Sequence, residues 1–170
     1  MKKATFILFF TITLNITGIA QFNSGFFIEN GCESPADDGQ FMVILSGDED
    51  YIYLSCDYGK TWRATASVKF WTSIAISATA EYQTAIERVN YDTSYVWRSS
   101  NYGKTWSRAV TTLGRITDVA MNYSGQRQTL IESDGHIWTS ANYGVNWGSR
   151  GADRNWYSIG MDSTGMYQTA

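Results

Sequence analysis

An eight-residue pattern recurs along the chain at nearly constant spacing. Residues 55–62 read Ser-Cys-Asp-Tyr-Gly-Lys-Thr-Trp, residues 99–106 read Ser-Ser-Asn-Tyr-Gly-Lys-Thr-Trp, and residues 140–147 read Ser-Ala-Asn-Tyr-Gly-Val-Asn-Trp. A self-similarity of roughly 40 to 45 residues is expected of propeller blades or of a helical array. The chain is therefore a tandem repeat, and its fold has to place equivalent residues at equivalent positions.

The segments between these octapeptides repeat as well. A pair of segments, 73–77 followed by 82–86, aligns with a second pair, 118–122 followed by 127–131, and with a third pair, 158–162 followed by 167–170. Each unit reads as four short strands, because runs of about five residues rich in Ile, Val, Tyr, Trp and Thr alternate with Gly, Ser, Asn and Asp. In the second unit the strands are predicted at 71–77, 82–88, 95–99 and 106–110.

Four-stranded units at this period, with Trp at a fixed place, favour a β-propeller of antiparallel blades over a solenoid. The predicted fold class is all-β, with about three and a half blades and hence an incomplete ring. Residues 1–20 are predicted to be a signal peptide and 21–39 an N-terminal segment; the blades follow at approximately 40–66, 71–110, 115–149 and 155–170. We expect a fragment of a longer protein, or a homodimer in which two copies complete a ring.

The octapeptide predicts a hairpin turn between the third and fourth strand of each unit. The Asx side chain can hydrogen-bond its own downstream backbone, and Gly adopts a positive φ without steric cost. The tryptophans are predicted to pack between neighbouring blades. The structural residues of the turns are Ser55, Asp57, Gly59 and Trp62; Ser99, Asn101, Gly103 and Trp106; and Ser140, Asn142, Gly144 and Trp147.

The pattern Ser-x-Asp-x-Gly-x-Thr-Trp resembles the Asp-box, or BNR repeat, of sialidases, sortilin-type receptors and photosystem assembly propellers. Residues 55–62 match it fully, whereas Asn101 and Asn142 replace the Asp, and Asn146 replaces the Thr. The resemblance extends over most of the chain after residue 40. It implies a propeller in which the Asp-boxes are structural turns on the edge opposite the ligand face.

On a propeller, the loops joining strands two and three and the links between blades share one face. A mixed polar rim on that face suits a glycan, a peptide or calcium, although loops are also polar for reasons of solvation alone. The candidate ligand-face residues are Asp48, Asp50, Tyr91, Asp92, Asp134, Arg150 and Asp153.

Catalytic motifs are missing. The sialidase resemblance implies an arginine triad, whose first member sits in an Arg-Ile-Pro context, but Pro35 is the only proline and has no arginine beside it. The paired carboxylates that glycosidases need do not converge in the sequence. A single histidine, His136, excludes the common multi-histidine zinc sites. No catalytic residue, cofactor or metal site is therefore predicted.

The N-terminus has the three parts of a cleavable signal peptide: Lys2 and Lys3, an apolar stretch, and Gly18-Ile19-Ala20 before Gln21. An uncleaved membrane anchor is the alternative. Cleavage would leave no stable membrane span and would remove two lysines, moving the formal net charge from -3 to about -5. This acidic balance and the lack of a basic stripe argue against a nucleic-acid partner.

The two cysteines, Cys32 and Cys56, are compatible with one disulfide in an oxidising compartment. Two unpaired cysteines are the alternative, because the sequence alone does not bring them within reach of each other.

Two functions stay open. The first is a secreted or cell-surface propeller that binds a glycan or a protein partner. The alternative is a fragment of a sialidase-like or other glycoside hydrolase whose catalytic residues lie partly in missing blades.

Overall fold

The structure, a computed structural model, describes residues 21–22, 40–46, 51–67 and 69–170. These residues form strands and turns, and no helix occurs among them. The strands are β1 (Gln21–Phe22), β2 (Met42–Leu45), β3 (Ile52–Ser55), β4 (Thr61–Ala64), β5 (Trp71–Ile76), β6 (Gln83–Arg88), β7 (Ser94–Ser99), β8 (Ser107–Leu113), β9 (Ile116–Met121), β10 (Gln128–Glu132), β11 (Gly135–Ser140), β12 (Gly148–Arg154), β13 (Gly160–Met161) and β14 (Gln168–Thr169).

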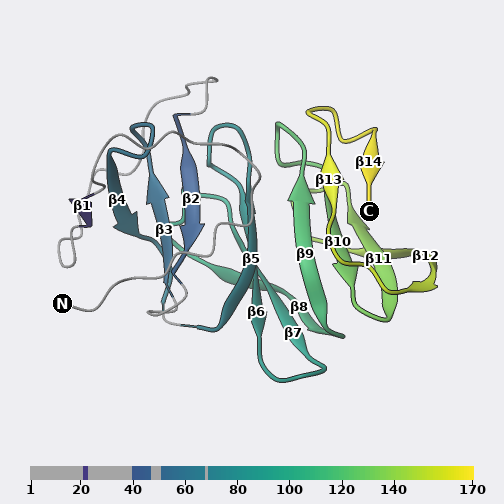
Figure 1. Cartoon of the computed structure of the whole chain (residues 1–170). Helices are drawn as coiled ribbons and strands as arrows, with labels where there is room; N and C mark the ends of the chain where they lie inside the picture. Colours follow the sequence, from purple (N-terminus) through teal and green to yellow (C-terminus); the bar gives the residue numbers. More distant parts are fainter. Residues whose placement is uncertain (1–20, 23–39, 47–50, 68) are drawn as a thin grey trace.

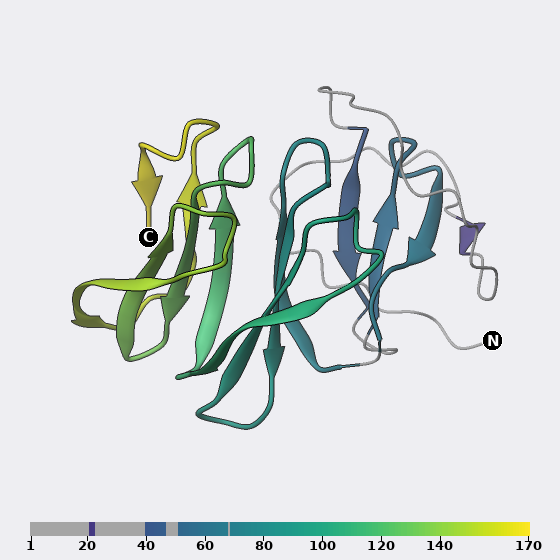
Figure 2. The ribbon, with the colours of Figure 1, turned by 180° about the vertical axis from the view of Figure 1, so that it is seen from behind.

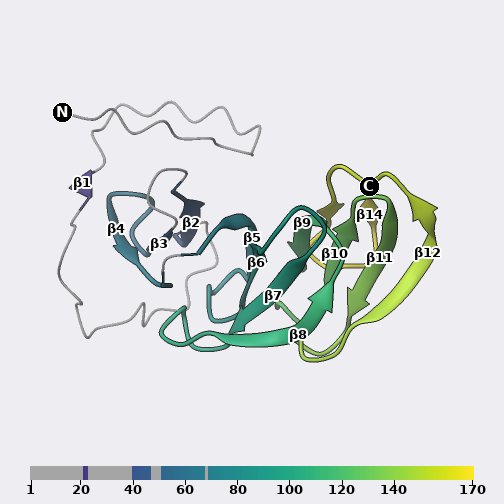
Figure 3. The ribbon, with the colours of Figure 1, turned by 90° about the horizontal axis from the view of Figure 1, so that it is seen from below.

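The strands form successive sheets that follow one another along the chain. Strands β2–β4, β5–β8 and β9–β12 pair antiparallel in sequence order, β13 pairs with β14, and β1 adds in parallel to β4. Seen from below, the sheets lie in an arc with β4, β8 and β12 on its outer edge (Figure 3). This arrangement is part of a β-propeller, so the predicted all-β fold with an incomplete ring is confirmed.

The two ends of the sheets carry different connections (Figures 1 and 2). The turns β5–β6, β9–β10 and β13–β14 lie at one end together with the octapeptide turn β3–β4. The β6–β7 loop lies at the opposite end, which we call the lower end. A ligand site on the lower end is thus separated from the repeated turns by the length of a strand.

The outer strands are longer than the sequence pattern predicts. The blades were expected to end near residues 110 and 149, but β8 continues to Leu113 and β12 to Arg154. The pairing register of both strands is irregular. In β8 it shifts opposite Ser94–Trp97 of β7, and in β12 it shifts opposite Gly135–Ile137 of β11. In β12, Gly151 adopts a φ of 77°, so the chain bulges and pairing continues past the predicted end.

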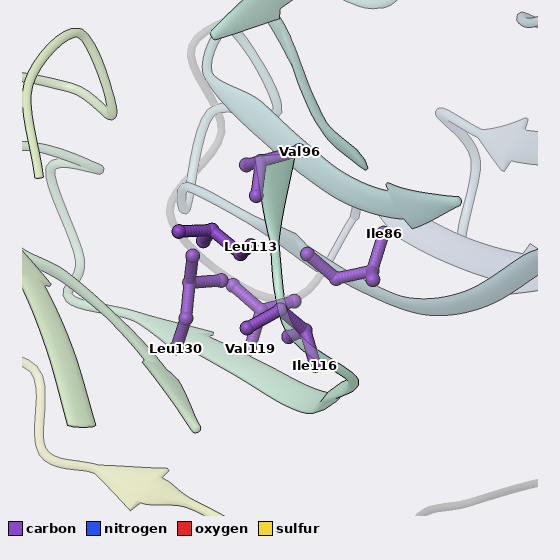
Figure 4. Packing of buried hydrophobic residues seen from close by; sticks show 6 residues of the cluster. All are labelled: Ile86, Val96, Leu113, Ile116, Val119 and Leu130. Atoms are coloured by element: carbon purple, nitrogen blue, oxygen red, sulfur yellow. The ribbon is translucent and has the colours of Figure 1, made fainter. Parts of the chain in front are cut away.

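Hydrophobic side chains fill the spaces between neighbouring sheets. One cluster joins the second sheet to the third (Figure 4) and comprises Ile86, Val96, Leu113, Ile116, Val119 and Leu130. Full burial of an aliphatic side chain of this size contributes about 1.5–3 kcal/mol. These contacts between sheets, more than the short strands themselves, stabilise the arc.

A hydrogen bond between a Thr and a Gln side chain recurs at the junctions between blades. The Thr84 hydroxyl donates to Gln128 Oε1 of the next blade at 2.7 Å, and the Thr129 hydroxyl donates to Gln168 Oε1 at 2.7 Å. Each Gln also donates from Nε2 to the backbone carbonyl three residues before it. We call each such contact a Thr–Gln pair.

The first junction lacks this pair. Val43 stands where the later blades have Thr, and Gln83 Oε1 is a buried acceptor without a hydrogen-bond partner. Gln83 keeps the local half of the arrangement, because its Nε2 donates to the Ala80 carbonyl at 3.0 Å. An unsatisfied buried acceptor costs about 1–3 kcal/mol, so the missing donor to Gln83 Oε1 destabilises the first junction.

Several sequence predictions concern residues that the structure does not describe. The proposed signal peptide (1–20), most of the segment 21–39, and Cys32 lie outside the described residues. The predicted Cys32–Cys56 disulfide therefore stays a prediction. Within the described part, nothing forms a helix of the length and hydrophobicity that a bilayer crossing requires.

Candidate functional site

The first octapeptide turn is closed by hydrogen bonds within the motif. The Ser55 hydroxyl accepts from the Gly59 amide at 2.8 Å and donates to Asp57 Oδ1 at 2.8 Å. Asp57 accepts from both the backbone amide (2.8 Å) and the hydroxyl (2.7 Å) of Thr61. Trp62 Nε1 donates to the Gly59 carbonyl at 3.0 Å. The Asp carboxylate is thus committed to holding the turn.

The second turn makes the same contacts with Asn in place of Asp, and the third keeps the contact to the backbone amide. Asn101 Oδ1 accepts from the Thr105 amide at 2.9 Å, and its Nδ2 donates to the Thr105 hydroxyl at 2.8 Å. Asn142 Oδ1 accepts from the Asn146 amide at 2.9 Å. The amide oxygen replaces one carboxylate oxygen, so the replacement of Asp by Asn preserves the turn.

Each turn contains a tyrosine in a left-handed conformation, which the sequence did not lead us to expect. Tyr58, Tyr102 and Tyr143 have φ values of 59°, 60° and 59°, and the Gly that follows each of them also has a positive φ. Non-glycine residues rarely adopt such φ values. Packing against the preceding blade offsets the cost: the ring of Tyr143 lies 4.3 Å, centroid to centroid, from that of Tyr82.

The turn glycines are required by close approach. A Cβ on Gly103 would lie 2.9 Å from Thr65 Cβ of the preceding blade, and one on Gly144 would lie 2.8 Å from Gln128 Oε1. The second octapeptide turn is therefore packed closely against the preceding blade, whereas the third is packed against β10 of its own blade.

The pKa of Asp57 is lowered in the folded chain. Partial burial acts to raise it, but hydrogen bonds from Thr61, Ser55 and Lys60 outweigh burial by stabilising the carboxylate. Asp162, in the β13–β14 turn, also has a lowered pKa, chiefly because the Thr164 hydroxyl donates to it at 2.7 Å. Both carboxylates are turn elements that depend on being ionised.

The predicted ligand-face residues lie in several different elements. Asp48 and Asp50 lie outside the described residues. Tyr91 and Asp92 lie exposed in the β6–β7 loop at the lower end, and Asp134 lies in the β10–β11 turn with a φ of 57°. These loops belong to two different blades, the second and the third.

Arg150 and Asp153 were expected in a loop between blades, and this placement is wrong. Both residues lie within β12, because the bulge at Gly151 lets the strand continue. Asp153 instead pairs with His136 of the neighbouring strand, with Oδ1 and Nδ1 3.2 Å apart. Neither residue therefore belongs to the ligand-face loops.

The lower end carries two arginine–aromatic pairs. The guanidinium carbon of Arg88, at the end of β6, lies 5.6 Å from the centroid of the Phe70 ring. That of Arg115, just before β9, lies 5.2 Å from the Tyr91 ring. Phe70 and Tyr91 are 55% and 76% exposed. We call Phe70, Arg88, Tyr91 and Arg115 the lower rim.

Backbone contacts bring the two pairs next to each other. Arg88 is paired across the sheet with Ser94, and the Ser94 hydroxyl accepts from the amide of Ile116, the residue after Arg115. Sequence reasoning placed Tyr91 on this face but missed Phe70 and Arg88. No sequence signal marks them, because their adjacency depends on two strands and two links that meet only in the fold.

The arginines of the lower rim are not neutralised within the described chain. Neither takes part in an ion pair between described residues, and the Nε atoms of both are buried without a hydrogen-bond partner. Their terminal nitrogens make no hydrogen bond to the part of the chain that the structure describes. Planar guanidinium groups held over aromatic rings present donors suited to a carboxylate.

Most described carboxylates already have structural partners. Glu87 and Glu132 accept from the indole N–H groups of Trp97 and Trp138, at 2.6 and 3.1 Å. Asp118 accepts from Ser73 of the preceding blade and from Ser158 of the following one. Among the residues described, no group of three or more His, Cys, Asp or Glu side chains is placed to hold a metal ion.

The antiparallel blades lie in an arc, and in the first three blades a Ser-Asx-Gly-Trp turn joins the last two strands, which is the architecture of an Asp-box β-propeller. A family model for the BNR-Asp box repeat matches residues 96–109, which span β7, the second turn and the start of β8. This match agrees with the resemblance of the octapeptides to the Asp-box. Among curated protein sequences, none matches it significantly.

Solved structures share this fold. A GH74 enzyme from Niastella koreensis superposes with a TM-score of 0.55 and 22% identity over 69% of this chain. YCF48 from Cyanidioschyzon merolae gives 0.53 and 21% over 66%, and a YCF48 bound to D1 peptide gives 0.52 and 15% over 66%. The chain covers 17%, 34% and 36% of those structures, respectively. At these identities the likeness shows the fold alone.

Proposed function

We propose that this chain is a propeller binding module that captures an acidic segment of a protein partner on the lower rim. The observation that carries the proposal is the pair of arginines over exposed aromatic rings with no carboxylate partner in the described chain. The fold is also that of a YCF48 solved in complex with a D1 peptide. A peptide carboxylate would supply the acceptors that Arg88 and Arg115 lack.

The test uses residues 21–170 and a fluorescently labelled decapeptide of alternating Glu and Leu, with a Lys-Leu decapeptide as the ligand control. We expect the acidic peptide to bind by fluorescence anisotropy. The double variant Arg88→Gln/Arg115→Gln should weaken binding at least tenfold, because each charged hydrogen bond contributes about 1.5–3 kcal/mol. Added salt should weaken the binding of the unmodified protein.

The matched control is Arg127→Gln, which removes the same charge from an exposed position before β10, at the opposite end of the sheets. Its affinity for the acidic peptide should equal that of the unmodified protein. No binding of the acidic peptide, or equal losses in the rim and control variants, would overturn the proposal.

The alternative proposal is a part of a glycoside hydrolase, the class to which the GH74 neighbour belongs. Against it stands the structural commitment of Asp57, Glu87, Asp118 and Glu132, which leaves few carboxylates free for acid–base chemistry. Release of the chromophore from nitrophenyl sialosides or glucosides by residues 21–170 would favour this alternative over the binding module.

Export through residues 1–20 is part of our proposal and rests on the sequence alone. A partner would then be met outside the cytoplasm or at the cell surface. N-terminal sequencing of the protein recovered from the medium or cell surface should begin at Gln21; an intact Met1 would contradict it.

A further inference from the structure

A cleft lined by three tryptophans opens between the first and second blades. It has a volume of about 250 Å³, and its lining includes Trp71, Trp97 and Trp106 together with Lys69 and Lys104. The links Thr65–Ser67 and Thr105 complete the walls. We call it the tryptophan cleft. It involves none of the four lower-rim residues.

The three rings meet at angles and form a corner. Trp71 and Trp97 lie edge to face, with centroids 6.4 Å apart and planes at 81°, and Trp106 lies 6.1 Å from Trp71 at 41°. Trp71 is 9% exposed and forms the floor, whereas Trp97 and Trp106 are half-buried. A small ring could therefore contact two indole surfaces at once.

The indole N–H groups are already used inside the protein. Trp97 Nε1 donates to Glu87, Trp71 Nε1 to the Ser67 carbonyl, and Trp106 Nε1 to the carbonyls of Thr65 and Gly103. What the tryptophans offer a ligand is thus their ring surface. Ring surfaces of this kind accept the C–H face of a sugar as well as an aromatic ring.

The charge of the cleft comes from its lysines. Lys69 is 3.2 Å from Glu87 and 4.4 Å from the Trp97 centroid, so its charge is partly balanced. Lys104 is exposed and makes no ion pair with any described residue. A ligand that fills the cleft would therefore gain from one negative group placed toward Lys104.

The repeat shows that packing does not require this cleft. At the next junction the equivalents of Lys69 and Trp71 are Gly114 and Ile116. There, a Cβ on Gly114 would clash with the Glu132 carboxylate, so that side chain occupies the corresponding space. Trp138 and Trp147 are retained at the positions of Trp97 and Trp106. The cleft is present at the first junction because Lys69 and Trp71 stand where the next junction has Gly114 and Ile116.

We infer that the tryptophan cleft binds a carboxylate-bearing sugar ring, as in a hexuronate residue of a polysaccharide. Small-molecule pockets usually have volumes of about 300–1,000 Å³, so a cleft of about 250 Å³ admits a single ring-sized group. The apolar face of the ring lies on Trp97 and Trp106, and its carboxylate faces Lys104. This inference rests on the proposed role as a binding module but uses a different site and a different ligand.

The test titrates residues 21–170 with a tetramer of galacturonic acid and with its methyl ester, which keeps the rings and removes the charges. Calorimetry and tryptophan fluorescence report binding. The free acid should bind, and Lys104→Gln should weaken it about tenfold, because a charged hydrogen bond contributes about 1.5–3 kcal/mol. The ester should bind the unmodified protein about as weakly as the acid binds the variant.

Lys60→Gln is the matched control, since Lys60 is exposed at the same place in the first octapeptide but does not line the cleft. It should leave the affinity unchanged. Trp97→Phe, checked by circular dichroism for folding, should reduce binding together with the fluorescence change.

Three outcomes would overturn the inference: no binding of the acid at millimolar concentration, equal losses in the two lysine variants, or binding of indole-3-acetate but not of the uronate. The double variant Arg88→Gln/Arg115→Gln should bind the uronate normally. Its retention of uronate binding separates a failure of the cleft from a failure of the lower rim.

Discussion

At the scale of the residue, Asp57 differs from its counterparts in the later turns by carrying a charge. Its folded pKa is lowered below the ordinary value of 3.8 because the hydrogen bonds to the carboxylate outweigh burial. The stabilisation it provides is therefore complete above its unfolded pKa and is lost as the pH falls through its folded pKa. Asn101 and Asn142 make the corresponding backbone contacts without titrating.

We predict that Asp57→Asn will reduce the loss of folding stability that occurs as the pH falls. The chain itself supplies the precedent, since Asn101 both accepts from and donates to Thr105. Urea unfolding at pH 7, 4 and 3 should show a smaller loss of stability for the variant than for the unmodified protein. Asp162 titrates in both proteins and so cancels in the comparison. Parallel pH profiles would show that Asp57 does not contribute in this way.

At the scale of the element, the Thr–Gln pair decides how one blade meets the next. Thr84→Val would leave Gln128 Oε1 buried without its 2.7 Å donor and should destabilise the protein by about 1–3 kcal/mol. The opposite change at the first junction, Val43→Thr, should stabilise it by about 0.5–1.5 kcal/mol, because it offers a donor to Gln83 Oε1. Urea denaturation measures both, and a destabilising Val43→Thr would contradict the assignment.

The sequence predicted the elements better than the contacts between them. The strands of the second unit were expected at 82–88 and 95–99 and lie at Gln83–Arg88 and Ser94–Ser99, because each run is rich in strand-forming residues and ends at turn residues. The Thr–Gln pairs were visible only as a repeated Gln-Thr dipeptide, since nothing local says which blade supplies the acceptor. The bulge at Gly151 was hidden for the same reason, and so was the corner made by Trp71 and Trp97.

At the scale of the whole molecule, the last blade presents large apolar side chains to solvent. Tyr157, Met166 and Tyr167 are 83%, 71% and 77% exposed. Tyr82, the equivalent of Tyr167 in the second blade, instead lies 4.3 Å from the ring of Tyr143 in the third blade, centroid to centroid. Exposed aromatic surface at this density is typical of an interface.

We therefore predict that residues 21–170 self-associate as their concentration rises. Sedimentation velocity should show a growing mass, and Tyr157→Ser/Tyr167→Ser should shift the population toward monomer. Tyr91→Ser removes an equally exposed ring at the lower rim and should leave the mass unchanged. A monomer at all concentrations would speak against this surface as an interface, and a dimer would agree with two copies joining into one ring.

The Thr–Gln pair also bears on how such a chain can be rearranged by recombination. In each later unit the acceptor Gln and the donor Thr are consecutive residues, as in Gln128–Thr129, so a unit carries one half of each of its two junctions. A duplicated second or third unit would carry both its Gln and its Thr, so no Gln side chain would lose its hydrogen-bond donor. The first unit has Met42 and Val43 at these positions, so inserting it between two others would break the Thr–Gln bond at that junction and leave two junctions without one. Blade number can thus change by copying inner units at little cost, while the first unit is restricted to its own place in the order.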